Sequence, residues 1–414
     1  MAEIKPEIET FAKIKVVGVG GSGGSAVNHM IDLGIKGVEF IAINTDIQAL
    51  HANKASKKLH IGKGVTRGLG AGMNPELGRQ AAEESQNEIR EVLKDANMVF
   101  VTCGMGGGTG TGASPIVAEI SRDLGALTIA VVTKPFAFEG NQRKNLADRG
   151  MMELTDKVDA IITIPNDRIF QIIDKKASLL ESFSKVDDVL RQGVQGIAEL
   201  ITVPGRINVD FADVKAVMSN SGSALMGIGQ ATGENRAIEA AKLAINSPLL
   251  EMSIDGARGI LFTIQGGSNL GMGEVQEAAK IITASADEDA KIIFGIITNE
   301  KMKDEVKITV VATGFDQGTP GRRVETYSGS MGGHPYIPNP VVASGQQSQI
   351  STPVSATNSM SHSTPENNNY VSPSRPKISP VKAAQAEPAR RKDSYETDEE
   401  DDLGIPAFIR KKMM

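Results

Sequence analysis

Apolar and polar positions alternate in blocks along the first 170 residues of this chain. Short runs rich in β-branched residues are followed by glycine-rich turns or by apolar residues at helical spacing. These runs lie at Ile14–Val19, Val38–Thr45, Met98–Thr102, Leu127–Thr133 and Ala160–Ile164. Alternating strands and helices predict an α/β fold with a parallel, doubly wound sheet, which binds its ligands at the carboxyl ends of the strands.

A long amphipathic pattern follows, from Leu179 to Ile201. Apolar residues recur on one helical face, at Phe183, Val186, Leu190, Val194, Ile197 and Ile201. Pro204-Gly205 ends the pattern, and a helix of this length spans roughly 30 Å. We therefore expect a long central helix that joins two domains.

The second half of the chain predicts a smaller α+β domain with a mixed or antiparallel sheet, because its last strands follow each other closely. Strands are expected at Ala224–Gly229, Ile260–Ile264, Ile292–Ile297 and Val306–Val311, and helices near Asn235–Ile245 and Gly273–Ala284. From about Gly318, Ser, Pro, Gln and Asn dominate, which predicts a disordered tether.

These patterns divide the chain into six parts. We expect a flexible N-terminus (1–11), a ligand-binding α/β domain (12–178), the central helix (179–203), the α+β domain (204–317), a disordered linker (318–401) and a partner-binding peptide (402–414). The terminal peptide places apolar anchors beside a basic end in the run Leu403-Gly404-Ile405-Pro406-Ala407-Phe408-Ile409-Arg410-Lys411-Lys412. That pattern is typical of a short linear binding motif.

The richest glycine loop, Gly104 to Gly112, follows a predicted strand and precedes an apolar helical pattern. Ser114 is expected to be the N-cap of that helix, with Pro115 at its first position. Glycines let the backbone approach a bulky anion, and a helix N-terminus adds partial positive charge. A flexible linker is the alternative, but linkers are not framed by a strand and a capped helix. The loop therefore predicts a phosphate-binding site.

Two further glycine loops occur in the same domain, at Gly20–Ser25 and Gly68–Pro75, and the second of them opens a predicted helix that carries Leu77, Ala81 and Ile89. Three such loops at the carboxyl ends of strands would surround a polyphosphate. The first loop also satisfies the GxGxxG fingerprint of a Rossmann dinucleotide site, with Asp46 at a plausible distance for a ribose contact. A Walker A motif, GxxxxGK[ST], is absent from the sequence, which excludes a P-loop enzyme.

Composition narrows the class of function. The net charge is -6 and aromatic residues make up 4% of the chain, so neither a basic field nor stacking platforms point to nucleic acid. The single cysteine, Cys103, is expected to be a small buried core residue, and the five histidines show no metal-ligand spacing. No apolar run reaches the roughly 20 residues of a membrane span, so we expect a soluble, cytoplasmic protein without direct membrane insertion.

Two polar groups outside the glycine loops are candidates for chemistry. Glu139 and Arg143 follow a sheet strand at a spacing compatible with one helix face, where they could contact a ligand or form a surface ion pair. Asp210 and Asp213 lie just past the central helix, in the turn Asn208–Val214. An Asx turn or helix cap is the structural alternative for these carboxylates.

The chain resembles the tubulin/FtsZ family of GTPases. Its central loop, Gly106-Gly107-Gly108-Thr109-Gly110-Thr111-Gly112, is similar to the family signature, and Asn208–Asp213 is similar to its synergy loop. Ile405–Arg410 resembles its C-terminal peptide. The similarity runs from about Ala12 to Phe315 and through the final dozen residues.

The resemblance implies a GTP- or GDP-binding site. Phosphates would contact Gly21–Ser25 and Gly108–Gly110, although Ser25 replaces the usual asparagine, while Asn166 and Asp187 would read guanine with Phe183 stacked on the base. Phe183 could instead belong only to the helix stripe. The full set of expected nucleotide ligands is Gly20, Gly21, Ser22, Gly23, Gly24, Ser25, Asp46, Gly72, Gly106, Gly107, Gly108, Thr109, Gly110, Thr111, Glu139, Arg143, Asn166, Phe183 and Asp187.

Hydrolysis of GTP requires a group that orients water at the γ-phosphate. Asp210, Asp213 and Asn208 could do this, but they lie at the far end of a helix of about 30 Å from their own nucleotide. A head-to-tail neighbour would bring them to the phosphate and would build a filament. Mg²⁺ is expected with the phosphates, held mostly through water, and no dedicated protein site for a metal is predicted.

The resemblance also implies partners and place. These are further copies of the chain, a membrane adaptor such as the actin-like FtsA bound through Leu403–Lys412, and a division ring at midcell. Two other functions stay open. A Rossmann oxidoreductase would use Gly18–Gly23 and Asp46, although no His or Tyr constellation accompanies them. A nucleotide-binding scaffold without turnover is the second, and the pair Asp210 and Asp213 weighs against it.

Overall fold

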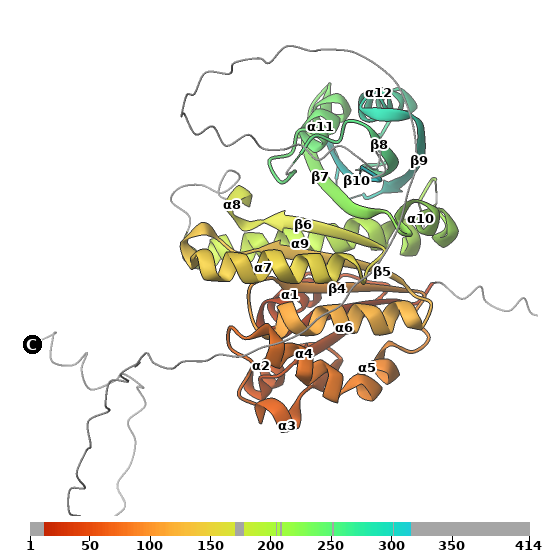
Figure 1. Cartoon of the computed structure of the whole chain (residues 1–414). Coiled ribbons are helices and arrows are strands. Elements are labelled where there is room, and N and C mark those ends of the chain that lie inside the picture. The colour runs from red at the N-terminus through yellow and green to blue at the C-terminus, as the bar shows by residue number, and fades with distance from the viewer. Residues whose placement is uncertain are drawn as a thin grey trace, which may run out of the picture. The chain divides into compact units, whose positions relative to one another are not determined.

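One ten-stranded sheet runs through the part of the chain that the structure describes, in the order β3-β2-β1-β4-β5-β6-β7-β10-β8-β9 (Figure 1). This computed structural model describes residues 12–169, 178–203, 205–207, 209–250, 252–300 and 302–315, which belong to one unit, Met1–Thr326. The expected N-terminus, linker and terminal peptide lie outside the described residues, as does Asn208.

The first six strands are parallel and confirm the doubly wound half of the predicted fold. They are β1 (Ile14–Val19), β2 (Val38–Asn44), β3 (Lys57–His60), β4 (Met98–Gly104), β5 (Leu127–Lys134) and β6 (Ala160–Pro165). The order of the strands reverses between β1 and β4. Both strands end in a glycine loop, so the predicted phosphate loops meet at the switch point of the sheet.

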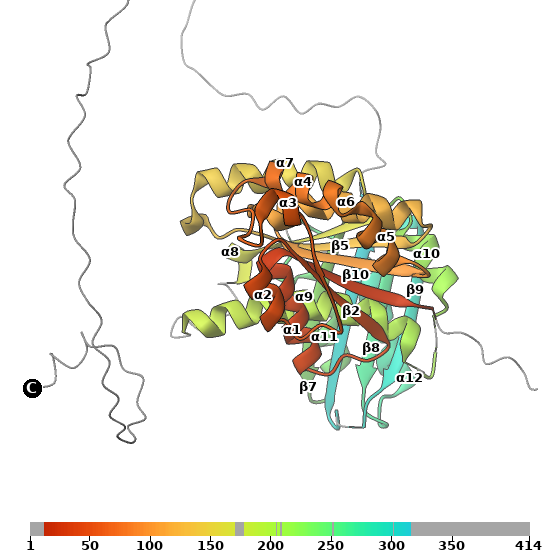
Figure 2. The ribbon, with the colours of Figure 1, turned by 90° about the horizontal axis from the view of Figure 1, so that it is seen from below.

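Helices cover both faces of these strands (Figure 2). One face carries α1 (Gly20–Asp32), α2 (Ile47–Ala52) and α9 (Leu179–Thr202), and the other carries α3 (Lys63–Thr66), α4 (Pro75–Glu84), α5 (Gln86–Leu93), α6 (Thr109–Asp123) and α7 (Asn141–Thr155). Successive strand residues point to opposite faces, so Val16 packs in the core beneath α1 and α9 while Val17 packs beneath α4 to α7. This explains why the strands read as continuous apolar runs.

Helix α9 confirms the predicted central helix within one residue at its C-terminus. Ser178 caps its N-terminus in a capping box, accepting a hydrogen bond from the Glu181 N–H at 3.2 Å. The apolar stripe is buried at Val186, Leu190, Val194 and Ile197. At 24 residues, the helix is about 36 Å long.

The C-terminal part is the predicted α+β arrangement with a mixed sheet. Strand β10 (Glu305–Thr313) is antiparallel to both β7 (Gly222–Thr232) and β8 (Ala257–Gly266), while β9 (Ala286–Thr298) is parallel to β8. Helices α10 (Phe211–Met218), α11 (Arg236–Ile245) and α12 (Met272–Thr283) complete it. Ala160–Ile162 of β6 pairs with Gly222–Ala224 of β7, so the two halves share one sheet, which the sequence pattern did not predict.

Three local predictions were wrong. Helix α6 begins at Thr109 after the N-cap Gly108, not after Ser114, and Pro115 lies inside it. The helix after the third glycine loop breaks at Ser85 into α4 and α5. Glu139 ends the short 3₁₀-helix η1 (Ala137–Glu139), whereas Arg143 belongs to α7, because Gly140 between them has φ +93°.

Close backbone packing explains the early start of α6. A Cβ at Gly112 would collide with the Pro75 carbonyl oxygen, and one at Gly78 would collide with the Gly108 carbonyl oxygen. Helices α4 and α6 therefore approach each other through glycines on both sides. This contact favours a helical conformation for Thr109–Ala113. The cost is one missing hydrogen bond, because Pro115 has no N–H to donate to the Thr111 carbonyl.

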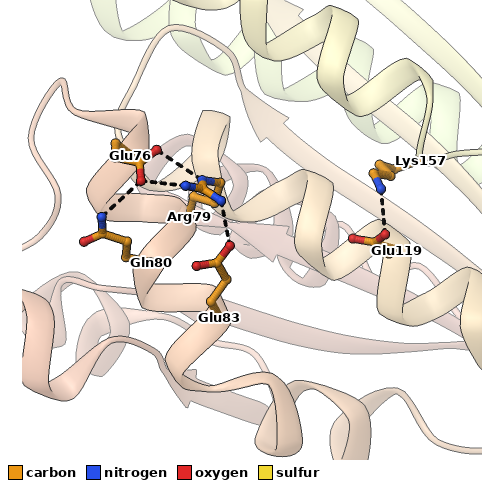
Figure 3. A network of polar contacts seen from close by, with 6 residues as sticks. All are labelled: Glu76, Arg79, Gln80, Glu83, Glu119 and Lys157. Carbon is orange, nitrogen blue, oxygen red and sulfur yellow. Dashed lines mark hydrogen bonds and ion pairs between the residues drawn. The ribbon is translucent and has the colours of Figure 1, made fainter.

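Outside this contact, α4 and α6 carry exposed ion pairs (Figure 3). Arg79 lies between Glu76 and Glu83 at 2.7 and 2.8 Å, and Gln80 donates to Glu76 at 3.0 Å. Lys157 pairs with Glu119 of α6 at 2.6 Å. The pairs of Arg79 lie within α4, and the Lys157 pair joins α6 to the residues after α7, so none of them sets the spacing between α4 and α6.

The packing yields a stability prediction. Gly112→Ala should lower the free energy of unfolding by about 2 kcal/mol or more, because the new methyl group forces α4 and α6 apart. Chemical denaturation followed by circular dichroism would measure the change.

Gly273→Ala in α12 is the matched control, since a Cβ there meets no atom within 4 Å and alanine favours a helix. Equal stability of the two variants would contradict the packing argument.

Candidate functional site

A cavity of about 350 Å³ opens at the carboxyl ends of the parallel strands. This volume lies within the usual range for small-molecule sites, which begins near 300 Å³. Its walls come from α1, β4, β5, η1, α7, α8 (Asn166–Ile169) and α9, so the topology gathers residues that are far apart in sequence. The lining residues are Ser22, Ser25, Gly104, Met105, Thr133, Pro135, Glu139, Arg143, Asn166, Phe183, Val186 and Asp187.

Helix α1 lines one side of this cavity through Ser22 and Ser25, and the loop that leads to α6 lines it through Gly104 and Met105, whereas Gly106–Thr111 are not among the lining residues. Neither α1 nor α6 receives a side-chain hydrogen bond from its N-cap residue, Val19 or Gly108, so the first-turn N–H groups are left for a bound anion. The loops touch, because a Cβ at Gly20 would lie 2.9 Å from the Gly110 nitrogen. Thr111 stabilises the central glycine loop, because its hydroxyl accepts a hydrogen bond from the Gly106 N–H at 2.8 Å.

One hydrogen bond joins the third glycine loop to the central one, and a second joins the central loop to the end of β2. Gly108 donates its N–H to the Gly72 carbonyl at 2.7 Å, and the hydroxyls of Thr45 and Thr109 lie 2.6 Å apart. Asp46 is the N-cap of α2 and accepts hydrogen bonds from the N–H groups of Gln48 and Ala49. This residue therefore has a structural role, and its expected contact with a nucleotide stays a prediction.

A smaller cavity of about 220 Å³ lies on the other side of α1. It is lined by Gly20, Gly21, Gly24 and Ser25 together with residues that the sequence analysis missed, Asn28, Asn44 and Asn53 among them. Thr133 and Pro135 of the main cavity were missed as well, although their place at the carboxyl end of β5 is the signal that points to such residues.

The opposite end of the main cavity holds hydrogen-bond acceptors without a protein partner. The Asn166 Oδ1 atom is buried and accepts no hydrogen bond within the described part of the chain. Burial raises the pKa of Asp187 to about 6, and its carboxylate forms no hydrogen bond or ion pair with another described residue. Guanine offers a matching pair of donors in N1–H and its exocyclic amine, a pair that adenine lacks. These residues therefore fit a guanine base.

An aromatic cluster borders these acceptors. The Phe183 ring is 44% exposed and meets the Phe136 ring edge-on, with centroids 5.9 Å apart and planes at 81°. Phe138 stacks on the other ring, that of Phe136, at 5.0 Å. Phe183 therefore combines a fixed orientation with an open face, which suits a stacking contact better than a place in the buried stripe of α9.

Glu139 and Arg143 also line the cavity. Arg143 Nη1 is 2.7 Å from Glu139 Oε2, and Glu139 Oε1 accepts a hydrogen bond from the Phe136 N–H at 2.8 Å. The ion pair that the sequence analysis left as an alternative is thus present, and it lines the cavity. Both side chains are held ready for polar contacts with a ligand.

The carboxylate turn lies at the other pole of the molecule, beyond the C-terminal end of α9. Asp210 is the N-cap of α10 and accepts a hydrogen bond from the Asp213 N–H at 2.7 Å, so the predicted helix cap is present. Both residues are exposed. Neither lines the cavity, and the roughly 36 Å length of α9 keeps them away from it.

The remaining expectations concern Cys103, metal binding and membrane insertion. Cys103 is fully buried, and burial raises the pKa of its thiol to about 11, which suits a core residue and not a nucleophile. Within the described residues, no group of three or more His, Cys, Asp or Glu side chains could hold a metal ion. No helix in this part of the chain is long and apolar enough to cross a membrane.

Comparison with known proteins identifies both halves. The GTPase-domain model of the tubulin/FtsZ family matches residues 13–174, and the C-terminal-domain model of the FtsZ family matches residues 222–316. An empty FtsZ dimer from M. jannaschii is 47% identical, with a TM-score of 0.71, over 74% of this chain and 90% of that chain.

More distant structures share the fold. CetZ2 from Haloferax volcanii, solved as a GTPγS-bound protofilament, is 22% identical over 72% of this chain and 92% of its own, with a TM-score of 0.63. CetZ1 from the same organism, a GDP-bound monomer, is 20% identical over 74% of this chain and 95% of its own, with a TM-score of 0.64. Through its GTPase domain and its FtsZ-type C-terminal domain, the chain belongs to the tubulin/FtsZ family.

Proposed function

We propose that this protein is a GTPase that polymerises head to tail and completes each active site with a carboxylate turn from the neighbouring subunit. The observation that carries the proposal is the separation between the cavity and the exposed pair Asp210 and Asp213. The family supports GTP binding and turnover, and the printed descriptions of relatives, an FtsZ dimer and a CetZ2 protofilament, support self-association.

In the proposed complex, GTP lies across the main cavity. Its phosphates are bound by the open N-termini of α1 and α6 through Gly20–Ser25 and Gly106–Thr111, and Asp46 and Gly72 are proposed as further nucleotide contacts. Glu139 and Arg143 contact the ribose and phosphates. Asn166 and Asp187 accept hydrogen bonds from guanine, which stacks on Phe183.

Hydrolysis transfers the γ-phosphoryl group to water. A bond forms between the water oxygen and phosphorus, the bond from phosphorus to the β–γ bridging oxygen breaks, and GDP leaves with that oxygen. Asp213 is the better candidate to orient the water, because its carboxylate has no partner among the described residues while Asp210 caps α10. Asn208 is proposed to assist. Mg²⁺, bound by the phosphates and by water, would neutralise charge.

The remaining parts of the chain extend this proposal. The proposed GTP-binding domain comprises residues 12–178, the central helix residues 179–203 and the C-terminal domain residues 204–317. The linker 318–401 would tether the peptide Leu403–Lys412, which binds a membrane adaptor such as FtsA. The filaments would lie in the cytoplasm and form the division ring at midcell.

A complementation experiment tests catalysis by the neighbour. Asp213→Ala protomers should bind GTP but not hydrolyse it in their own polymers. Asp187→Asn should exchange guanine for xanthine, because xanthine carries a carbonyl oxygen where guanine carries its amine. In an equal mixture supplied with XTP and radiolabelled GTP, about half of the Asp213→Ala protomers meet an intact turn and hydrolyse GTP.

A mixture that releases no more phosphate from GTP than Asp213→Ala alone would contradict a shared active site. Asp213→Ala mixed with a second preparation of Asp213→Ala is the matched control, because every turn in it is defective.

The raised pKa of Asp187 predicts a pH dependence of nucleotide binding. The ionised carboxylate accepts the guanine donors, whereas the protonated acid does not, so affinity for GDP should be constant above pH 7. It should fall by roughly tenfold per pH unit below about 6. Fluorescence titration with a labelled GDP would measure this.

The phosphates of GDP also titrate near pH 6. The phosphate pKa of free GDP, measured by phosphorus NMR, gives the contribution of the phosphates, and the pH dependence that remains after this correction belongs to Asp187. A corrected affinity that stays constant well below a pH of about 6 would contradict the assignment of Asp187 as the acceptor for guanine.

A further inference from the structure

Asp159 is a buried carboxylate that joins the GTPase half to the end of helix α10. It immediately precedes β6 and is only 8% exposed. Its Oδ2 atom accepts a hydrogen bond from the Thr128 N–H at 2.9 Å, and its Oδ1 atom accepts one from the Asn220 N–H at 3.3 Å. Its backbone carbonyl accepts further hydrogen bonds from Ser221 and Gly222 at 2.8 and 3.1 Å.

Arg122 of α6 completes this group. Its Nη2 atom donates to Asn220 Oδ1 at 2.9 Å and lies 4.0 Å from Asp159 Oδ1. Asn220 holds the left-handed conformation, with φ +50°, which costs free energy unless neighbouring contacts fix it. Two side chains of the GTPase half thus hold the turn that stops α10.

The other end of α10 is held by the C-terminal sheet. Arg206 donates its N–H to the Ile296 carbonyl at 2.9 Å, and Ile296 donates to the Ile207 carbonyl at 3.1 Å. The eight-residue helix between the two anchors is about 12 Å long. Because the helix is held at both ends, a change at its C-terminal anchor tilts it about its N-terminal attachment and redirects Asp210 and Asp213.

Strand β6 connects this anchor with the nucleotide cavity. Asp159 lies just before its first residue, and Asn166 lies just after its last. Six strand residues span about 20 Å. The amide proposed to read the base and the carboxylate that holds α10 are thus fixed at the two ends of one central strand.

We propose that Asp159, assisted by Arg122, is a positioning residue for hydrolysis at the next subunit's nucleotide. The inference rests on the proposed shared active site. Asp159 touches no nucleotide itself. It fixes α10 so that Asp210 and Asp213 reach the neighbour's γ-phosphate, where a displacement of about 1 Å costs on the order of 10²-fold in rate.

Asp159→Asn is the most selective test. Both carboxylate oxygens accept N–H groups, but an amide has one oxygen, so its NH₂ group must face either the Asn220 N–H or the Thr128 N–H. We expect kcat for GTP to fall by about 10- to 100-fold. GTP affinity and the concentration at which polymer forms should stay unchanged.

Arg122→Gln is a second variant, which leaves the buried Asp159 carboxylate in place. It changes a side chain that is 35% exposed, so it should disturb the fold less. It should lower kcat in the same way but less strongly, and Arg122→Lys should restore part of the rate. A loss of GTP affinity with kcat unchanged in these variants would overturn the positioning role.

The mixed polymer separates this defect from a damaged fold. Asp159→Asn protomers loaded with GTP should regain hydrolysis beside Asp187→Asn protomers loaded with XTP, because the latter supply an intact turn. No recovery would mean that Asp159 serves its own nucleotide site or the fold, which overturns the inference.

Asp213→Ala keeps the two proposals distinguishable. If Asp213→Ala polymers hydrolyse GTP at the wild-type rate, the shared active site itself fails. If Asp213→Ala is inactive while Asp159→Asn has wild-type kcat, only the positioning role fails.

Discussion

A carboxylate can orient water at a phosphate only within a few ångströms. Helix α9 separates the cavity from the exposed carboxylates of Asp210 and Asp213. Its 24 residues run from the base end of the cavity to the turn that carries Asp210 and Asp213. The helix is fixed in place, because its buried residues between Val186 and Leu200 belong to the same apolar core as the strands. In the proposed function, assembly brings the phosphate of one subunit to the carboxylates of the next, which would account for an exposed, polar turn after such a long helix.

The cavity itself is built to receive a ligand with donors at one end and an anion at the other. An unpaired acceptor such as Asn166 Oδ1 and a half-buried carboxylate such as Asp187 each cost free energy until a ligand pairs with them. The open N-termini of α1 and α6 need an anion in the same way. Guanine and the phosphates of GTP meet both requirements, which supports the proposed nucleotide site.

Periodicity was enough to predict most of the fold. The continuous apolar runs of β1 and β4 reflect burial on both faces, and the stripe of α9 reflects burial on one. The start of α6 was predicted wrongly because proline usually occupies the first position of a helix. Here the glycine contact between α4 and α6 favours an earlier start. That contact lies between distant segments, and local sequence does not encode it.

The candidate site was predictable where residue type alone signals chemistry. Glycine loops and a carboxylate turn can be recognised in the sequence itself. Asp210 is the N-cap of α10, which was the structural alternative to a catalytic role. Asp159 carries no such signal, because Thr128 and Asn220 lie 31 and 61 residues away from it. The pairing of β6 with β5 brings Thr128 to Asp159 and the pairing with β7 brings Asn220, so only the three-dimensional arrangement reveals the anchor.

Dilution provides the sharpest measurement. GTP turnover per subunit should be followed as wild-type protein is diluted, with sedimentation on the same samples to determine the polymer fraction. Turnover that vanishes with the polymer is the expected result, since an isolated subunit cannot bring its carboxylates to its own phosphate. Full turnover by protein that sediments as a monomer would contradict an active site shared between neighbours.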